Sequence, residues 1–87
     1  MDTKQPFRHN IIKTNNFTVY LTHYADSQKI YLWVDFNKFN GVWLSTATTF
    51  DKVINGSIKQ CAKQVNNPKN NFLWNDVSAS LKKLSNS

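Results

Sequence analysis

The hydrophobic pattern of this chain changes its period once, near Thr48, and that change constrains the fold more than any other feature. Before Thr48, apolar residues occur in short runs rich in β-branched and aromatic side chains, as is typical of β-strands. After Thr48, they recur at the i, i+3, i+4, i+7 spacing of amphipathic helices. The sequence therefore predicts an α+β fold, with a small antiparallel sheet of three to four strands packed against two C-terminal helices.

Residues 17–24 and 29–36 are the strongest strand candidates, because both are dense in β-branched and aromatic residues. The four residues between them include Asp26 and Ser27, so the connection is short enough for an antiparallel hairpin. A turn at 37–41 then leads to a third strand at 42–45, at the sheet edge. Residues 8–13 are predicted to add a fourth strand.

The first predicted helix runs to residue 65 and begins near Thr48 or Thr49, either of which can cap it. Asn55-Gly56 is a strong hairpin signal and opposes this assignment. The apolar stripe nevertheless stays in phase across the glycine, which favours the helix and indicates that Gly56 marks either close packing on the sheet or a bend. The stripe consists of Phe50, Val53, Ile54, Ile58, Cys61, Ala62 and Val65.

Pro68 is expected to end the first helix, because proline disfavours helical conformation in the residue before it. A second helix follows, in which apolar residues from Leu73 to Leu84 repeat at helical spacing. Residues 1–87 are predicted to form one small domain, with 1–7 and 85–87 loosely ordered.

Composition limits the possible functions of the chain. Its 87 residues carry 11 Lys and Arg against 5 acidic residues, a formal net charge of +6. The longest apolar run is five residues, at 30–34, so no membrane span is predicted. No apolar segment of signal-peptide length follows the first basic residues, and a cytoplasmic location is expected.

The sequence offers little catalytic or metal-binding chemistry. His9, His23 and the lone Cys61 have no zinc-ligand spacing, and the two glycines of the chain cannot build a phosphate-cradling loop. The aspartates show no pairing along the sequence, and Cys61 lies on the apolar helix stripe as a small hydrophobic residue would. We therefore expect no enzyme activity, no catalytic residues, no metal and no cofactor; a concave site joining His23 to an aspartate would instead indicate an enzyme.

The two strongest strands separate into two kinds of face when their residues are sorted by alternation. One face is a conventional core surface, and the other combines aromatic rings with hydroxyl groups and a flanking lysine. The core face carries Val19, Leu21, Ile30, Leu32 and Val34; the other carries Thr18, Tyr20, Thr22, Tyr24, Lys29, Tyr31, Trp33 and Asp35.

An aromatic sheet face with nearby cations is the arrangement on which single-stranded nucleic acid stacks. Ten of the 11 cationic residues are Lys, which favours diffuse attraction to phosphate over bidentate base recognition. The leading hypothesis is a non-enzymatic binding module for a nucleic acid or a nucleic-acid-handling complex. Its predicted contacts are Tyr20, Tyr31 and Trp33 for stacking, with Lys29, Lys38 and Arg8 as electrostatic support.

Three alternatives remain open. The second helix or the N-terminal segment could cover the aromatic face and make its rings part of the core. The positive charge could serve only solubility. Because Tyr and Trp also dominate protein interfaces, the chain could instead be a protein-interaction inhibitor or small regulatory subunit, as a monomer or as a homodimer through the sheet edge or the C-terminal helix.

An antiparallel sheet backed by two helices is similar in outline to many small phage inhibitors, including some anti-CRISPR proteins. The resemblance covers size and element order only, and it implies an inhibitor that binds a nucleoprotein complex without identifying any site residue. The 12 Asn and 10 Lys of the chain have A/T-rich codons, which would suit a phage or mobile-element genome.

Overall fold

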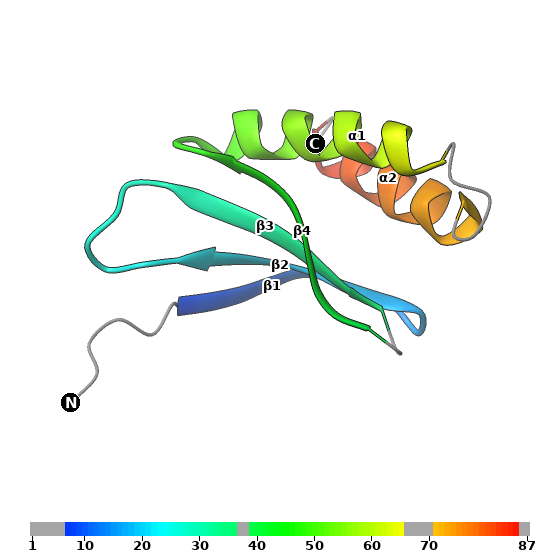
Figure 1. Cartoon of the computed structure of the whole chain (residues 1–87), viewed down its shortest axis with the longest axis horizontal. Helices are drawn as coiled ribbons and strands as arrows, with labels where there is room; N and C mark the ends of the chain where they lie inside the picture. The colour runs from blue at the N-terminus through cyan, green and yellow to red at the C-terminus, as the bar shows by residue number, and fades with distance from the viewer. Residues whose placement is uncertain (1–6, 37–38, 66–70, 86–87) are drawn as a thin grey trace.

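The computed structural model describes residues 7–36, 39–65 and 71–85, and it has one sheet and two helices. The strands form an antiparallel sheet in the order β1-β2-β3-β4, with both helices C-terminal to them (Figure 1). This confirms the predicted α+β fold. The elements are β1 (Phe7–Lys13), β2 (Phe17–His23), β3 (Ile30–Phe36), β4 (Phe39–Ala47), α1 (Phe50–Val65) and α2 (Asn71–Ser85).

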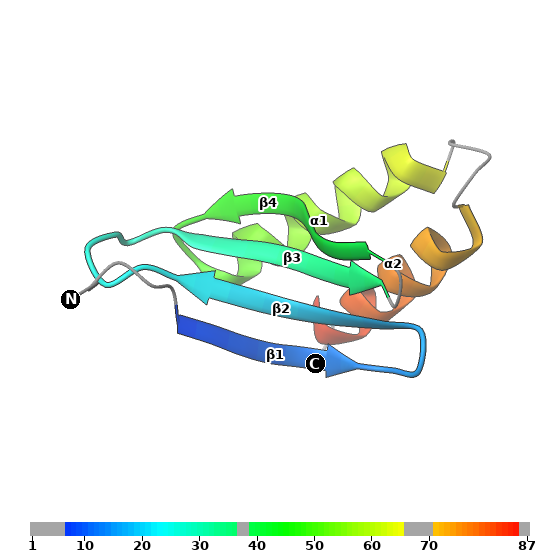
Figure 2. The ribbon, with the colours of Figure 1, turned by 60° about the horizontal axis from the view of Figure 1, so that its bottom comes forward.

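Both helices lie on the same side of the sheet (Figures 1 and 2). α1 packs on β4 and β3, and α2 packs alongside α1. The apolar stripes of the helices meet the core face predicted for β2 and β3, so Val19, Leu32 and Val34 are fully buried. Of the two described helices, neither lies over the aromatic face.

The β4 strand extends beyond the predicted 42–45 at both ends, and its pairing with β3 contains two irregularities. Gly41 lies within β4 at a φ of 63°, a backbone conformation that glycine adopts without a steric penalty. Residues 40 and 41 stand opposite Asp35 alone, since Val34 pairs with Val42 and Phe36 with Phe39. Residues 39–41 of the turn predicted at 37–41 therefore belong to a bulged strand, and residues 37 and 38 lie outside the described part of the chain.

A second bulge in β4 turns two successive side chains toward the helices. Leu32 pairs with Ser45 and Trp33 with Trp43, which leaves Leu44 as the extra residue. Leu44 is buried in the core, and Ser45 also points toward α1. Strict alternation would have sent Ser45 to the opposite face, so the bulge is what brings its hydroxyl to the helix.

The contact between α1 and β4 is close and partly polar. The Ser45 and Ser57 hydroxyls lie 2.8 Å apart, and each lies within hydrogen-bonding distance of the Val53 carbonyl oxygen, at 2.7 and 2.8 Å. A Cβ at Gly56 would lie 3.2 Å from the Ser45 Cβ. The helix through Asn55-Gly56 is thus confirmed, and the glycine allows close packing on the sheet.

The start of α1 has the expected cap. The backbone N–H of Lys52 donates to Thr49 Oγ1 at 3.3 Å, and that of Val53 to the Thr49 carbonyl at 3.1 Å. Asp51 occupies the first turn, where the helix dipole favours a negative charge. The predicted stop at Pro68 lies outside the described residues.

Replacing Gly56 with alanine tests the close approach of α1 to β4. An exposed helical Gly→Ala change stabilises by about 1 kcal/mol, whereas overpacking costs about 1–3 kcal/mol. Ser45 belongs to a paired strand and is hydrogen-bonded to α1, so it has little room to move away from a new methyl group. We therefore expect Gly56→Ala to lower the free energy of unfolding, measured by urea denaturation. Asn55→Ala, at the exposed neighbouring position, should have no destabilising effect; a more stable Gly56→Ala protein would contradict the account.

Candidate functional site

The face of the sheet turned away from the helices, called the open face below, collects the polar and aromatic side chains of all four strands. Cross-strand pairing places Tyr20 opposite Trp33, and Trp33 opposite Trp43. Thr22 pairs with Tyr31 in the same way. The open face comprises Arg8, Asn10 and Lys13 of β1, Thr18, Tyr20 and Thr22 of β2, Tyr31, Trp33 and Asp35 of β3, and Trp43 and Thr46 of β4.

Three aromatic rings form a row across the middle of this face, from β2 to β4. The Tyr20 and Trp33 rings are parallel to within 7°, with centroids 6.4 Å apart. Trp43 continues the row and is 50% exposed. Tyr31 lies further along β3, where its ring makes an edge contact with Tyr24 at 5.6 Å between centroids.

Threonine hydroxyls fix both indoles of the row. Trp33 Nε1 donates to Thr22 Oγ1 at 2.9 Å, and Trp43 Nε1 donates to Thr46 Oγ1 at the same distance. With their polar edges bonded to the sheet, these rings have little rotameric freedom left to lose on binding. What the indoles can offer a ligand is therefore their faces.

Arg8 reaches across from β1 and covers Tyr20. Its guanidinium carbon lies 3.8 Å from the centroid of the Tyr20 ring, and its Nη2 lies 3.2 Å from Asp35 Oδ2. Asp35 also accepts the backbone N–H of Gly41. Burial raises the pKa of the Tyr20 hydroxyl, with the charge of Asp35 adding to the rise and Arg8 opposing it.

The structure brings four of the six predicted contact residues together on one face: Arg8, Tyr20, Tyr31 and Trp33. Tyr20 is only 8% exposed, so it supports Arg8 and Trp33 more than it presents a surface of its own. Lys29 is exposed and lies in the β2–β3 connection, one residue before β3. Lys38 lies outside the described residues.

Trp43 is the aromatic residue of the open face that the sequence analysis did not assign to it. The predicted strand at 42–45 contained it, and Val42, Trp43 and Leu44 do alternate in the structure, with Val42 and Leu44 toward the core and Trp43 exposed. That alternation was the sequence signal available, but the sequence analysis applied it to the two strongest strands alone.

Charge is nearly balanced on the open face. Arg8 and Asp35 neutralise one another, and Lys13 adds one positive charge at the end of β1. Most of the described lysines lie on the other side of the molecule, exposed on the helices: Lys52, Lys59 and Lys63 of α1, and Lys82 and Lys83 of α2. Stacking groups and cationic groups are thus largely separated.

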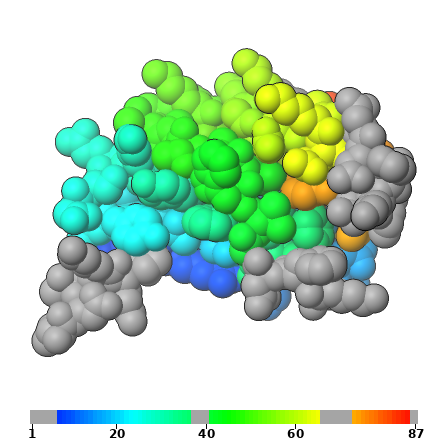
Figure 3. Space-filling model, in the orientation of Figure 1, coloured from blue at the N-terminus to red at the C-terminus, as the bar shows by residue number. Residues whose placement is uncertain are grey.

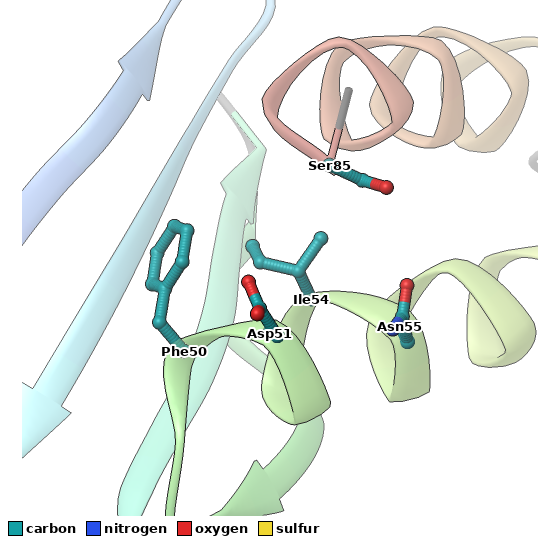
Figure 4. A pocket seen from close by; sticks show the side chains of 5 residues that line it. All are labelled: Phe50, Asp51, Ile54, Asn55 and Ser85. Atoms are coloured by element: carbon teal, nitrogen blue, oxygen red, sulfur yellow. The ribbon is translucent and has the colours of Figure 1, made fainter. Parts of the chain in front are cut away.

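A pocket of about 210 Å³ lies between the start of α1 and the end of α2 (Figure 4). Asp51 is the one titratable side chain among its lining residues, which are Phe50, Asp51, Ile54, Asn55 and Ser85. The pocket is on the helical side of the sheet and has no part in the open face.

The structure describes residues 7–36, 39–65 and 71–85. No group of three or more His, Cys or acidic side chains in these ranges is placed to hold a metal ion. Neither helix, over its described residues, is long and apolar enough to cross a membrane. Comparison with protein-family models, curated proteins and solved structures finds no match to this chain.

Cys61 is fully buried in the core under α1, as its place on the apolar stripe indicated. Burial raises the pKa of its thiol from 9.0 to about 12. Because the thiolate is the nucleophilic form, the folded protein keeps this side chain unreactive at neutral pH.

The raised thiol pKa predicts a loss of stability in alkaline solution. Above pH 9 the unfolded chain ionises Cys61 while the folded protein keeps it neutral until about pH 12. The free energy of unfolding should therefore fall with pH, with a contribution from Cys61 of up to about 1.4 kcal/mol per pH unit. Urea denaturation at pH 8, 9 and 10 would measure it. The Cys61→Ala protein should show a shallower decline; identical pH dependence in both proteins would contradict this assignment.

Proposed function

We propose that this protein is a non-enzymatic binding module whose open face stacks the bases of single-stranded nucleic acid, free or within a nucleoprotein complex. The observation that carries the proposal is the direct pairing of Trp33 with Trp43 on a sheet face that neither described helix covers. Flat rings on an exposed sheet are a common platform for unpaired bases, because every base has a face that can stack.

The fixed orientation of the two indoles supports this function. Each ring is tied through its N–H to a threonine, so stacking requires little further ordering of the side chain. A base stacked on such a ring contributes about 1–3 kcal/mol. Tyr31, half-buried on the same strand as Trp33, extends the surface along β3.

The polar groups of the open face favour tolerance of base sequence. The indole N–H groups are engaged with threonines, and Arg8 and Asp35 are engaged with each other. Few free donors and acceptors are left to read base edges, so recognition would depend on stacking. Because a duplex hides the faces of its bases, we expect single strands to bind more tightly than duplex.

Trp43→Ala tests the stacking surface directly. Fluorescence anisotropy of a labelled oligothymidine, at low and moderate salt, should show affinity weakened by about 1–3 kcal/mol. Trp33→Ala should act in the same direction, with an added loss of stability because the Trp33 ring also stacks on Tyr20. The matched control is Phe50→Ala, which removes a 40% exposed ring at the start of α1, away from the open face.

Two results would count against the proposal. One is an equal loss of affinity in Phe50→Ala and Trp43→Ala, which would show that the open face has no special role. The other is the absence of oligonucleotide binding at low salt by a folded wild-type protein.

A protein-interaction inhibitor or small regulatory subunit is the second candidate function. The Arg8–Asp35 pair favours it, since it leaves the open face with little net charge, while Tyr and Trp are common interface anchors. The similarity in outline to small phage inhibitors adds to this candidate. Two results together would support this second function: the protein binds no oligonucleotide, and it forms a complex with a protein partner that Trp43→Ala disrupts.

A further inference from the structure

Three exposed lysines of α1 form a straight row along one side of the helix. Lys52 and Lys59 are seven residues apart, and Lys59 and Lys63 are four apart. At 100° per residue, the three directions fall within about 40° of one another, and the axial separations are about 10 Å and 6 Å. Lys52, Lys59 and Lys63 are called the lysine row below.

The contact at Gly56 shows where the lysine row points. Gly56 faces Ser45 of β4, and the three lysines project within about 60° of the Gly56 direction, on its solvent side. Val53 and Ser57, which meet Ser45 of β4, project about 60° and 100° from Gly56 in the other direction, so the row runs along the solvent-facing flank of α1, next to the side that packs on β4. Figure 3 shows this side of the molecule, with α1 above β4.

The charge of the lysine row is not neutralised by a neighbouring carboxylate. Among the residues that the structure describes, Arg8 and Asp35 make the one ion pair. Asp51, next to Lys52 in sequence, projects about 100° away from it around the helix. The row is thus a free cationic surface, in contrast to the balanced charge of the open face.

β4 connects the lysine row to the stacking surface. Trp43 projects from β4 onto the open face, and Ser45 projects from the same strand toward α1. β4 is the last strand in the sheet order, so its outer edge lies between the two surfaces. A flexible chain that passes around this edge from Trp43 reaches the side of the sheet that carries α1.

We infer that the outer edge of β4 is the path of a bound single strand, with bases on Trp33 and Trp43 and phosphates along the lysine row. This inference rests on the proposed function and names the groups that hold the backbone of the ligand. It explains how a protein with a net charge of +6 could attract phosphate while its open face is nearly neutral. An anionic membrane fits less well, because most of the apolar stripe of α1 is used in the core, with Val53, Ile54 and Cys61 buried.

A pair of double variants with equal net charge tests the path. Lys59→Gln/Lys63→Gln removes two charges from the lysine row, and Lys82→Gln/Lys83→Gln removes two from α2, which packs alongside α1. Binding of a labelled oligothymidine is measured over a range of salt concentrations. Loss of two phosphate contacts should make the slope of log K against log salt shallower by about 1.4. We expect this change in the first variant and the wild-type slope in the second.

Trp43→Ala, measured in the same titration, separates the two proposals. It should weaken binding at every salt concentration and leave the slope unchanged. If the two lysine variants change the slope equally, or if neither does, the path over β4 is wrong; the stacking function then still stands if Trp43→Ala weakens binding. If Trp43→Ala binds as wild type does, both proposals fail.

Discussion

The close contact between α1 and β4 is the feature on which the rest of the structure depends. Because Gly56 has no side chain, the helix can approach until Ser45 and Ser57 meet at the Val53 carbonyl. α2 then packs against α1, and both apolar stripes are used on one side of the sheet. The opposite side has no described helix over it and presents the rings of Trp33 and Trp43.

Local periodicity was enough to predict much of this architecture. The change of period near Thr48 predicted the order of strands and helices, and alternation separated Val19 and Leu32 from Tyr20 and Trp33. The in-phase apolar stripe correctly outweighed the hairpin signal at Asn55-Gly56. These features depend on neighbours in sequence, and the structure confirms them.

The features that alternation could not predict come from contacts between distant segments. The bulge at Leu44 reverses the faces of the residues that follow it, so Ser45 was not expected at the helix. Arg8 was predicted as electrostatic support, but its position over Tyr20 and beside Asp35 depends on the register of β1 against β2. Register describes how the residues of two β-strands pair, and the alternation of residues within one β-strand does not determine it.

The account separates two kinds of interaction at the edge of one strand, with stacking on the open face and phosphate attraction along α1. Its most direct test is a titration of the ¹⁵N-labelled protein with unlabelled oligothymidine, followed by NMR through the backbone and indole N–H signals. We predict that the largest shift changes fall on the indoles of Trp33 and Trp43, on β4 and on α1 around Lys59. Changes confined to α2 or β1, or none at all at low salt, would contradict the account.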